Sequence, residues 1–185
     1  FQENQHQLHK SPRGTPLTRK NFESTLTSQP CRLDASYMEK RDHKGRSILF
    51  YATLESHIET ILKHIPDAMK SSFIDLADEN GETAILYHAK KARWEVIKAL
   101  VDHGAEVGVQ NRLHSTVLHQ LARSCKKTPL STLSKVQKEL LGNILMKHDN
   151  LVTQEDIRQQ TALHLAALSG NGAVVDFLCE RKEDL

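Results

Sequence analysis

The sequence predicts an all-α fold, an elongated solenoid of stacked helix-turn-helix units joined by short hairpin loops. Three observations support this prediction. Two similar segments begin at Asp78 and Asn111, 33 positions apart, a period typical of repeat architectures. Aromatic residues make up only 5% of the 185-residue chain, in which the helix formers Leu, Ala, Lys and Glu are common. The apolar bursts are also short, so each predicted helix needs a neighbour to be stable.

The first part of the chain differs from the rest. Residues 1–30 are rich in Gln, Asn, Ser, Thr, Pro and Lys and have few spaced hydrophobic residues. This composition predicts a flexible N-terminal arm, or a segment that a partner would order. The sequence begins with Phe1 rather than Met, so we expect it to be a fragment or a processed piece.

Four segments share one frame, in which an Asp or Asn opens a turn and a Ser or Thr precedes an apolar helix. The opening residues are Asp42, Asp78, Asn111 and Asp156, and the hydroxyl residues are Ser47, Thr83, Thr116 and Thr161. A hydroxyl at this position is suited to accept a hydrogen bond from the first helical turn. We therefore predict four units, which span residues 42–77, 78–110, 111–155 and 156–185.

These units resemble ankyrin repeats. The segment TALHLAALSGN, residues 161–171, carries the resemblance in unit four, and unit two matches at Asp78, Gly81, Thr83 and Ala89 among other positions. The resemblance implies that each unit is a turn followed by two stacked helices, with histidines such as His119 and His164 bracing the turn. Residues 31–41 are similar to the tail of a preceding repeat, which predicts a degenerate half-repeat or cap at the front of the stack.

Three units depart from the pattern. In unit three an insertion near residues 125–133 lengthens the connection between the two helices, and Ser134 with Gln137 predicts a capping box for the second helix. Unit one gains residues after its second helix, where we expect Met69 and Phe73 to pack a longer loop. Unit four stays apolar along AVVDFLC, residues 173–179, whereas a terminal repeat has a polar outer face. We therefore expect this unit to be truncated and the native chain to continue past Leu185.

Charge and cysteine content bear on the compartment and on the class of partner. A net charge of +2 gives no reason by itself to expect a nucleic-acid or membrane partner. The three cysteines are far apart and form no disulfide or zinc-binding pattern. This favours a reducing compartment, cytoplasmic or nuclear, or the host cytosol if the protein is a secreted effector. No apolar run approaches the roughly 20 residues needed to span a bilayer.

No catalytic centre is predicted. The sequence contains no phosphate-binding glycine-rich loop, nucleophile elbow or zinc-protease motif. His57, His119 and His164 match structural positions of the repeat family, and nothing places a base to activate Cys125. We expect no enzyme activity, no cofactor and no metal. Trp94, the only tryptophan, is expected to cover the seam between repeats rather than to anchor an interface.

The family resemblance implies a binding surface in a concave groove, formed by the hairpin tips and the exposed sides of the first helices. Carrying these positions over, with two lysines of the insertion, gives the candidate partner-binding set Lys44, Arg46, Leu54, Lys90, Lys91, Arg112, Leu113, Arg123, Lys126, Lys127, Ile157, Arg158 and Leu168. Spaced basic and aliphatic residues favour an acidic or mixed protein segment with apolar anchors. The alternative is a solvated face whose basic excess is due to chance. The lack of stacking aromatic residues disfavours nucleic acid.

The predicted function is therefore that of a monomeric protein–protein interaction module or scaffold, without membrane contact. The main alternative is a substrate-recruiting domain of a larger enzyme, for example a pathogen effector that acts in host cells. A purely structural spacer is the third hypothesis. The predicted fold cannot decide among them, because repeat folds support many unrelated functions.

Overall fold

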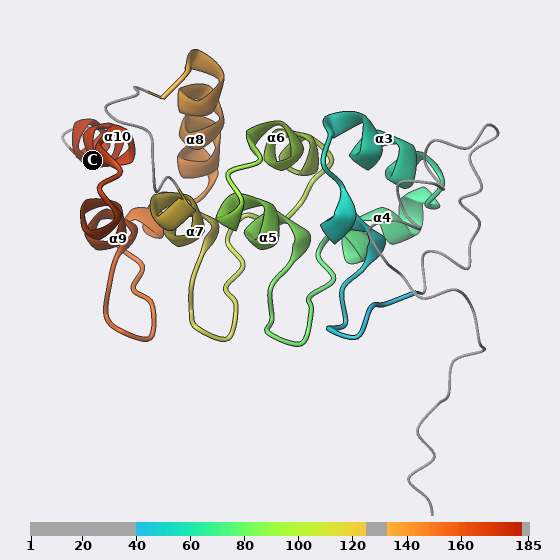
Figure 1. Cartoon of the computed structure of the whole chain (residues 1–185). Coiled ribbons are helices and arrows are strands. Elements are labelled where there is room, and N and C mark those ends of the chain that lie inside the picture. Colours follow the sequence, from blue (N-terminus) through green and yellow to red (C-terminus); the bar gives the residue numbers. More distant parts are fainter. Residues whose placement is uncertain (1–39, 125–132, 183–185) are drawn as a thin grey trace, which may run out of the picture.

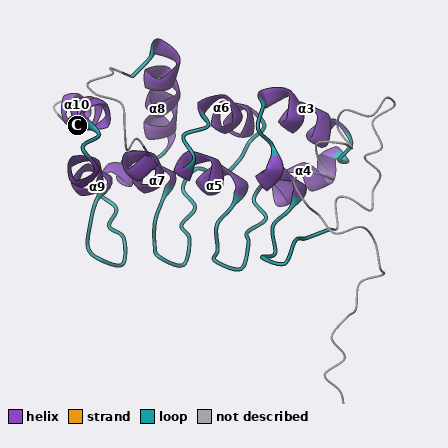
Figure 2. Ribbon diagram, in the orientation of Figure 1, coloured by secondary structure: helices purple, strands orange, loops and turns teal. Residues whose placement is uncertain are grey.

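The computed structural model describes residues 40–124 and 133–182, and this part of the chain contains helices and loops but no strand (Figure 2). The predicted N-terminal arm lies outside the described residues. So do all but two residues of the predicted half-repeat and all but one residue of the insertion. Lys126 and Lys127, which were predicted to contact a partner, are among the residues outside.

The helices lie in two rows, and the connecting loops project from the side of one row (Figure 1). The inner row consists of the 3-10 helix η1 (Ile48–Tyr51), α5 (Ala84–Lys90), α7 (Val117–Ser124) and α9 (Ala162–Ser169). The outer row consists of α3 (Glu55–Lys63), α6 (Trp94–Asp102), α8 (Lys135–Lys147) and α10 (Gly172–Lys182). Because α5 packs on α7 and α7 on α9, the structure confirms the predicted all-α solenoid.

The core runs between the two rows and along the seams between units. Ala89, Ala122 and Ala166 are fully buried in three successive inner helices. Their small side chains let these helices approach closely, and the larger core residues fill the space between the rows. No helix of the inner row exceeds eight residues among the described units. Such short helices are stable only because neighbouring units cover them.

Unit one differs from the expected pattern in two ways. Its inner helix is a single 3-10 turn that includes Ile48, Phe50 and Tyr51, β-branched and aromatic residues with lower helix propensity than the Ala and Leu of α9. The residues after α3, predicted to form a longer loop, instead form the helix α4 (Asp67–Ile74). Phe73 packs as expected and is 7% exposed, but Met69 points to solvent and is 58% exposed. The prediction of a loop was wrong because these eight residues contain no glycine or internal proline to break a helix.

The predicted capping box of unit three is confirmed. Ser134 Oγ accepts a hydrogen bond from Gln137 N at 3.3 Å, and Ser134 N donates to Gln137 Oε1 at 2.9 Å, which fixes the start of α8. A further 3-10 helix, η2 (Asp149–Val152), follows α8 and buries Leu151. Trp94, at the start of α6, is part of the core. In α10 the apolar residues Val174 and Phe177 are buried against the stack.

Candidate functional site

Each unit opens with a tight hairpin that we call its finger, residues 42–46, 78–82, 111–115 and 156–160. In every finger the side-chain oxygen of the first residue accepts hydrogen bonds from the backbone N–H groups two and four positions later. In unit two, for example, Asp78 Oδ1 accepts from Asn80 N at 2.8 Å and from Glu82 N at 3.0 Å. This side-chain-to-backbone pattern is typical of Asp and Asn, and it gives the four fingers one shape.

Backbone hydrogen bonds join the tips of adjacent fingers. Glu79 N donates to Lys44 O at 3.0 Å, Arg112 N to Asn80 O at 3.1 Å, and Ile157 N to Leu113 O at 3.1 Å. The fingers are thus held side by side, and the side chains at their tips are presented as a row. With the exposed ends of the inner helices, these tips form one surface, which we call the finger face.

A Ser or Thr precedes each inner helix as predicted, but the Ser47 and Thr83 side chains form no cap hydrogen bond, so the four units differ. In unit four the Thr161 hydroxyl oxygen accepts from His164 N at 3.5 Å, which confirms the predicted cap, and Thr161 N donates to His164 Nδ1 at 3.2 Å. In unit three, Thr116 Oγ1 donates to His119 Nδ1 at 2.7 Å, and His119 Nε2 donates to Gln160 O of the next unit at 3.0 Å. These histidines therefore position the finger face.

Burial keeps two histidines neutral. His88 is fully buried and its Nε2 donates to Leu49 O at 2.9 Å; burial, aided by the positive charge of Arg93, lowers the pKa of His88 to about 4. The pKa of His119 is also lowered, mainly by burial. Because each ring already has a backbone carbonyl as its hydrogen-bond acceptor, both are structural groups between units rather than exposed acids or bases.

Most of the predicted partner-binding residues lie exposed on the finger face. Those among the described residues are Lys44, Leu54, Lys90, Lys91, Arg112, Leu113, Arg123, Ile157, Arg158 and Leu168. The leucines and the isoleucine are 51% to 77% exposed, which is uncommon for side chains of this size in a folded unit. Arg46 is half-buried.

Two of the predicted basic residues are already engaged within the chain. Arg46 stacks over the Tyr87 ring, with 5.1 Å from its guanidinium carbon to the ring centroid, and its Nε lies 3.6 Å from the buried Asp78 Oδ2. Lys90 Nζ forms an ion pair at 3.0 Å with Glu82 Oε1, whose side chain is largely buried. These contacts hold units one and two in shape and reduce the charge available to a partner.

A hollow of about 230 Å³ opens on the finger face between units three and four. We call it the arginine hollow; its lining residues are Arg123, Arg158, Gln160, Leu165, Leu168 and Ser169. The Ser169 hydroxyl is engaged with Ala122 O at 2.6 Å and Leu165 O at 2.7 Å. Neither arginine forms an ion pair with any residue that the structure describes. The hollow thus presents two uncompensated guanidinium groups beside aliphatic side chains. Leu165 is a core residue, 4% exposed, and only its edge lines the hollow.

A second depression of about 590 Å³ lies between the starts of α3 and α6. We call it the glutamate depression; its lining residues are Thr53, Leu54, Glu55, Ser56, Glu59 and Glu95. Leu54 belongs to the predicted partner-binding set, whereas Glu59 and Glu95 were not predicted. The signal was present, since these two glutamates occupy the same position of successive outer helices.

The architecture defines a helical-repeat protein whose exposed finger face is supported by buried seams, mainly apolar, that also contain His88 and His119. A family model described as ankyrin repeat matches residues 158–185, which contain α9 and α10. The other units repeat the same order of finger, inner helix and outer helix, so the described stack as a whole is consistent with the ankyrin-repeat family. Ankyrin repeats in general bind other proteins and are not catalytic. Within the described ranges, every helix is too short or too polar to cross a membrane.

Proposed function

We propose that this chain binds an acidic or mixed segment of another protein on its finger face, and that the contact centres on the arginine hollow. The observation that carries the proposal is the pair of uncompensated guanidinium groups, Arg123 and Arg158, beside the exposed Leu168. Guanidinium groups form strong, directional hydrogen bonds with carboxylates, and an adjacent apolar surface adds hydrophobic contact. A segment with an acidic residue next to an aliphatic residue satisfies both requirements.

The remaining predicted residues extend this surface. Leu113 and Ile157, at joined finger tips, add exposed aliphatic area next to Arg112 and Arg158. Lys44 and Lys91 have no ion pair among the described residues and add positive charge further along the face. We assign smaller roles to Arg46 and Lys90, because their charges are already compensated by Asp78 and Glu82.

The test is affinity capture from cell lysate with the Arg123→Glu, Arg158→Glu double variant, the unmodified protein and a control variant as baits. The control, Lys63→Glu with Lys147→Glu, makes the same change of charge at exposed residues at the ends of α3 and α8. Reversal at Lys90 is avoided, because a new carboxylate there would face the buried Glu82 and destabilise unit two.

We expect the unmodified and control baits to retain a protein that the arginine variant loses, and we expect added salt to weaken its capture. Equal thermal unfolding of the three baits would show that the fold is unchanged. Identical sets of captured proteins from all three baits would overturn the proposal.

A further inference from the structure

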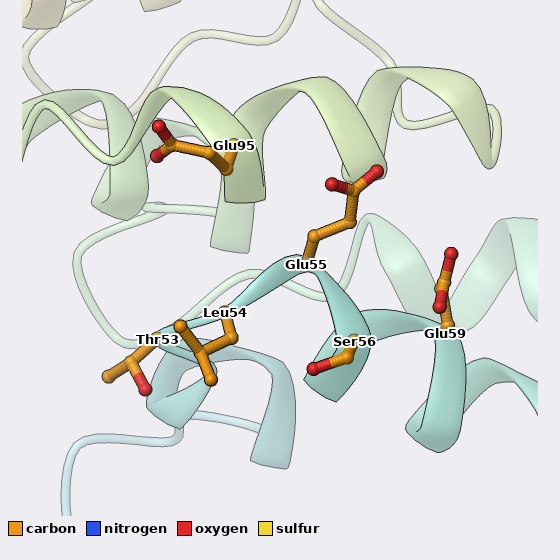
Figure 3. Close-up of a pocket in the computed structure, with 6 residues that line it drawn as sticks. All are labelled: Thr53, Leu54, Glu55, Ser56, Glu59 and Glu95. Carbon is orange, nitrogen blue, oxygen red and sulfur yellow. The ribbon is translucent and has the colours of Figure 1, made fainter.

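The finger face is not uniformly basic. Beside its unit-one end, Glu55 and Glu59 of α3 and Glu95 of α6 line the glutamate depression, as Figure 3 shows with the other lining side chains. Leu54 lies among these carboxylates and is 57% exposed. The three glutamates form no ion pair with any described residue; Lys98, which interacts electrostatically with Glu55, pairs with Asp102 at 2.5 Å.

The linings of the two openings share a position near the end of the inner helix. Leu54 follows Ser47 by seven positions, as Arg123 follows Thr116 and Leu168 follows Thr161. One opening therefore lies at the seam of units one and two, and the other at the seam of units three and four. Packed helices lie about 8–10 Å apart, so two repeat steps separate the openings by about 16–20 Å. An extended chain covers this distance with about five or six residues.

The charges near the two openings have opposite effects on the binding of an acidic segment. Over units one and two, Glu82 compensates Lys90 and Asp78 lies against Arg46, whereas three glutamates line the depression. An acidic segment that continued over this end would meet like charge, whereas a basic side chain with an aliphatic stem would find carboxylates and Leu54. In units three and four, the arginine hollow instead offers the positive charges of Arg123 and Arg158.

We infer that the partner segment is bipolar: an acidic–aliphatic stretch binds the arginine hollow, and a basic stretch about five or six residues away binds the glutamate depression. This inference rests on the proposed function, since it places the second stretch relative to the first. The two openings act together as a selectivity device, because a uniformly acidic or uniformly basic segment matches only one of them.

The test uses a display library of random peptides about 16 residues long, which is long enough to cover both openings. The library is selected separately against the unmodified protein, the Glu55→Gln, Glu95→Gln variant, the Arg123→Glu, Arg158→Glu variant and a control. The control is Glu155→Gln with Glu180→Gln, which neutralises two exposed glutamates outside both openings. Individual peptides are then measured by fluorescence polarisation.

With the unmodified and control proteins, we expect enriched peptides to carry Lys or Arg about five or six residues from an Asp or Glu beside Leu or Ile. With the glutamine variant, the acidic–aliphatic stretch should persist without the basic one, and a bipolar peptide should bind about tenfold more weakly than to the unmodified protein. An acidic–aliphatic motif with no basic stretch would overturn the inference and leave the proposed function in place. Enrichment unaffected by the arginine variant would overturn both.

Discussion

At the scale of single residues, the same helix-start position has two different environments. The hydroxyl groups of Thr116 and Thr161 are hydrogen-bonded to a histidine three positions later. In units one and two that later residue is Phe50 or Leu86, and the buried hydroxyls of Ser47 and Thr83 have no hydrogen-bond partner among the described residues. A buried hydroxyl without a partner loses its hydration and gains nothing in return.

This difference predicts opposite effects for one substitution. Thr83→Val removes an unpaired hydroxyl at nearly constant volume, so the free energy of unfolding should stay the same or rise by up to about 1 kcal/mol. Thr116→Val breaks a buried hydrogen bond to His119 and should lower the free energy of unfolding by about 1–2 kcal/mol. Urea unfolding followed by circular dichroism measures both values. Equal losses in the two variants would contradict this account of the caps.

Burial of His88 makes stability depend on pH. The folded-state pKa is about 4, below the ordinary value of 6.5, so the unfolded chain binds more protons between these values. Stability should therefore be full above about pH 6.5 and fall as the pH drops towards 4, by on the order of 3 kcal/mol. His88→Gln removes the titrating group and keeps an amide to donate to Leu49 O. Melting temperatures from pH 7 to pH 4.5 should fall less in this variant, and parallel curves would disprove the assignment.

Local residue pairs were predictable from the sequence, whereas pairs between units were not. The Thr161–His164 cap and the Ser134–Gln137 box join residues three positions apart, so a sequence pattern contains both partners. The engagement of Arg46 depends on Asp78 and Tyr87 of the next unit. The sequence predicted that Arg46 would be available to a partner, because only the packing of the two units brings Asp78 and Tyr87 to its side chain.

At the scale of elements, the turn from inner to outer helix contains a left-handed residue in units two and four. In unit four this residue is Gly170, with φ of 71°, and in unit two it is Ala92, with φ of 52°. The left-handed conformation costs a residue with a Cβ about 1–2 kcal/mol, whereas glycine adopts it freely. The short inner helices can end at this point only because the turn is so tight.

The two turns predict reciprocal substitutions. Ala92→Gly should raise the free energy of unfolding by about 0.5–1 kcal/mol, since relief of strain exceeds the added entropy of the unfolded chain. Gly170→Ala should lower it by about 1 kcal/mol through backbone strain alone, because a Cβ there would meet no atom within 4 Å. Gly172→Ala is the matched control, with open space and no positive φ. A loss of stability in the Ala92→Gly variant would refute the strain argument.

The order and type of most elements followed from the period, but α4 did not. Repetition predicts what the units share, and α4 occurs in unit one only, within a stretch that has no counterpart to align. The glutamate depression escaped prediction for a related reason. Its carboxylates come from α3 and α6, which belong to the outer row, and only the packed structure shows that they gather around Leu54.

At the scale of the whole molecule, the described units are joined by contacts between neighbours. Besides the finger-tip bonds, Arg93 Nη1 donates to Ala52 O at 2.9 Å, and Asn171 Nδ2 donates to Ala122 O at 3.4 Å. Arg93 and Asn171 occupy the same position of units two and four. Two different side chains therefore make the equivalent contact with the preceding unit at two seams. Because each seam joins only adjacent units, stability should be distributed along the stack rather than shared by one core.

His119 tests this distribution, since it joins unit three to unit four. His119→Ala removes the acceptor of the Thr116 hydroxyl and leaves Gln160 O without its donor, which should cost about 2–4 kcal/mol. Hydrogen exchange followed by mass spectrometry should show faster exchange in α7 and α9, while α5 and α6 keep nearly their original protection. Met146→Ala, at a side chain that is 79% exposed, is the control and should change neither region. If protection fell equally in all four units, the stack would unfold as one cooperative body, and the finger face of units three and four could not open or rigidify independently of units one and two.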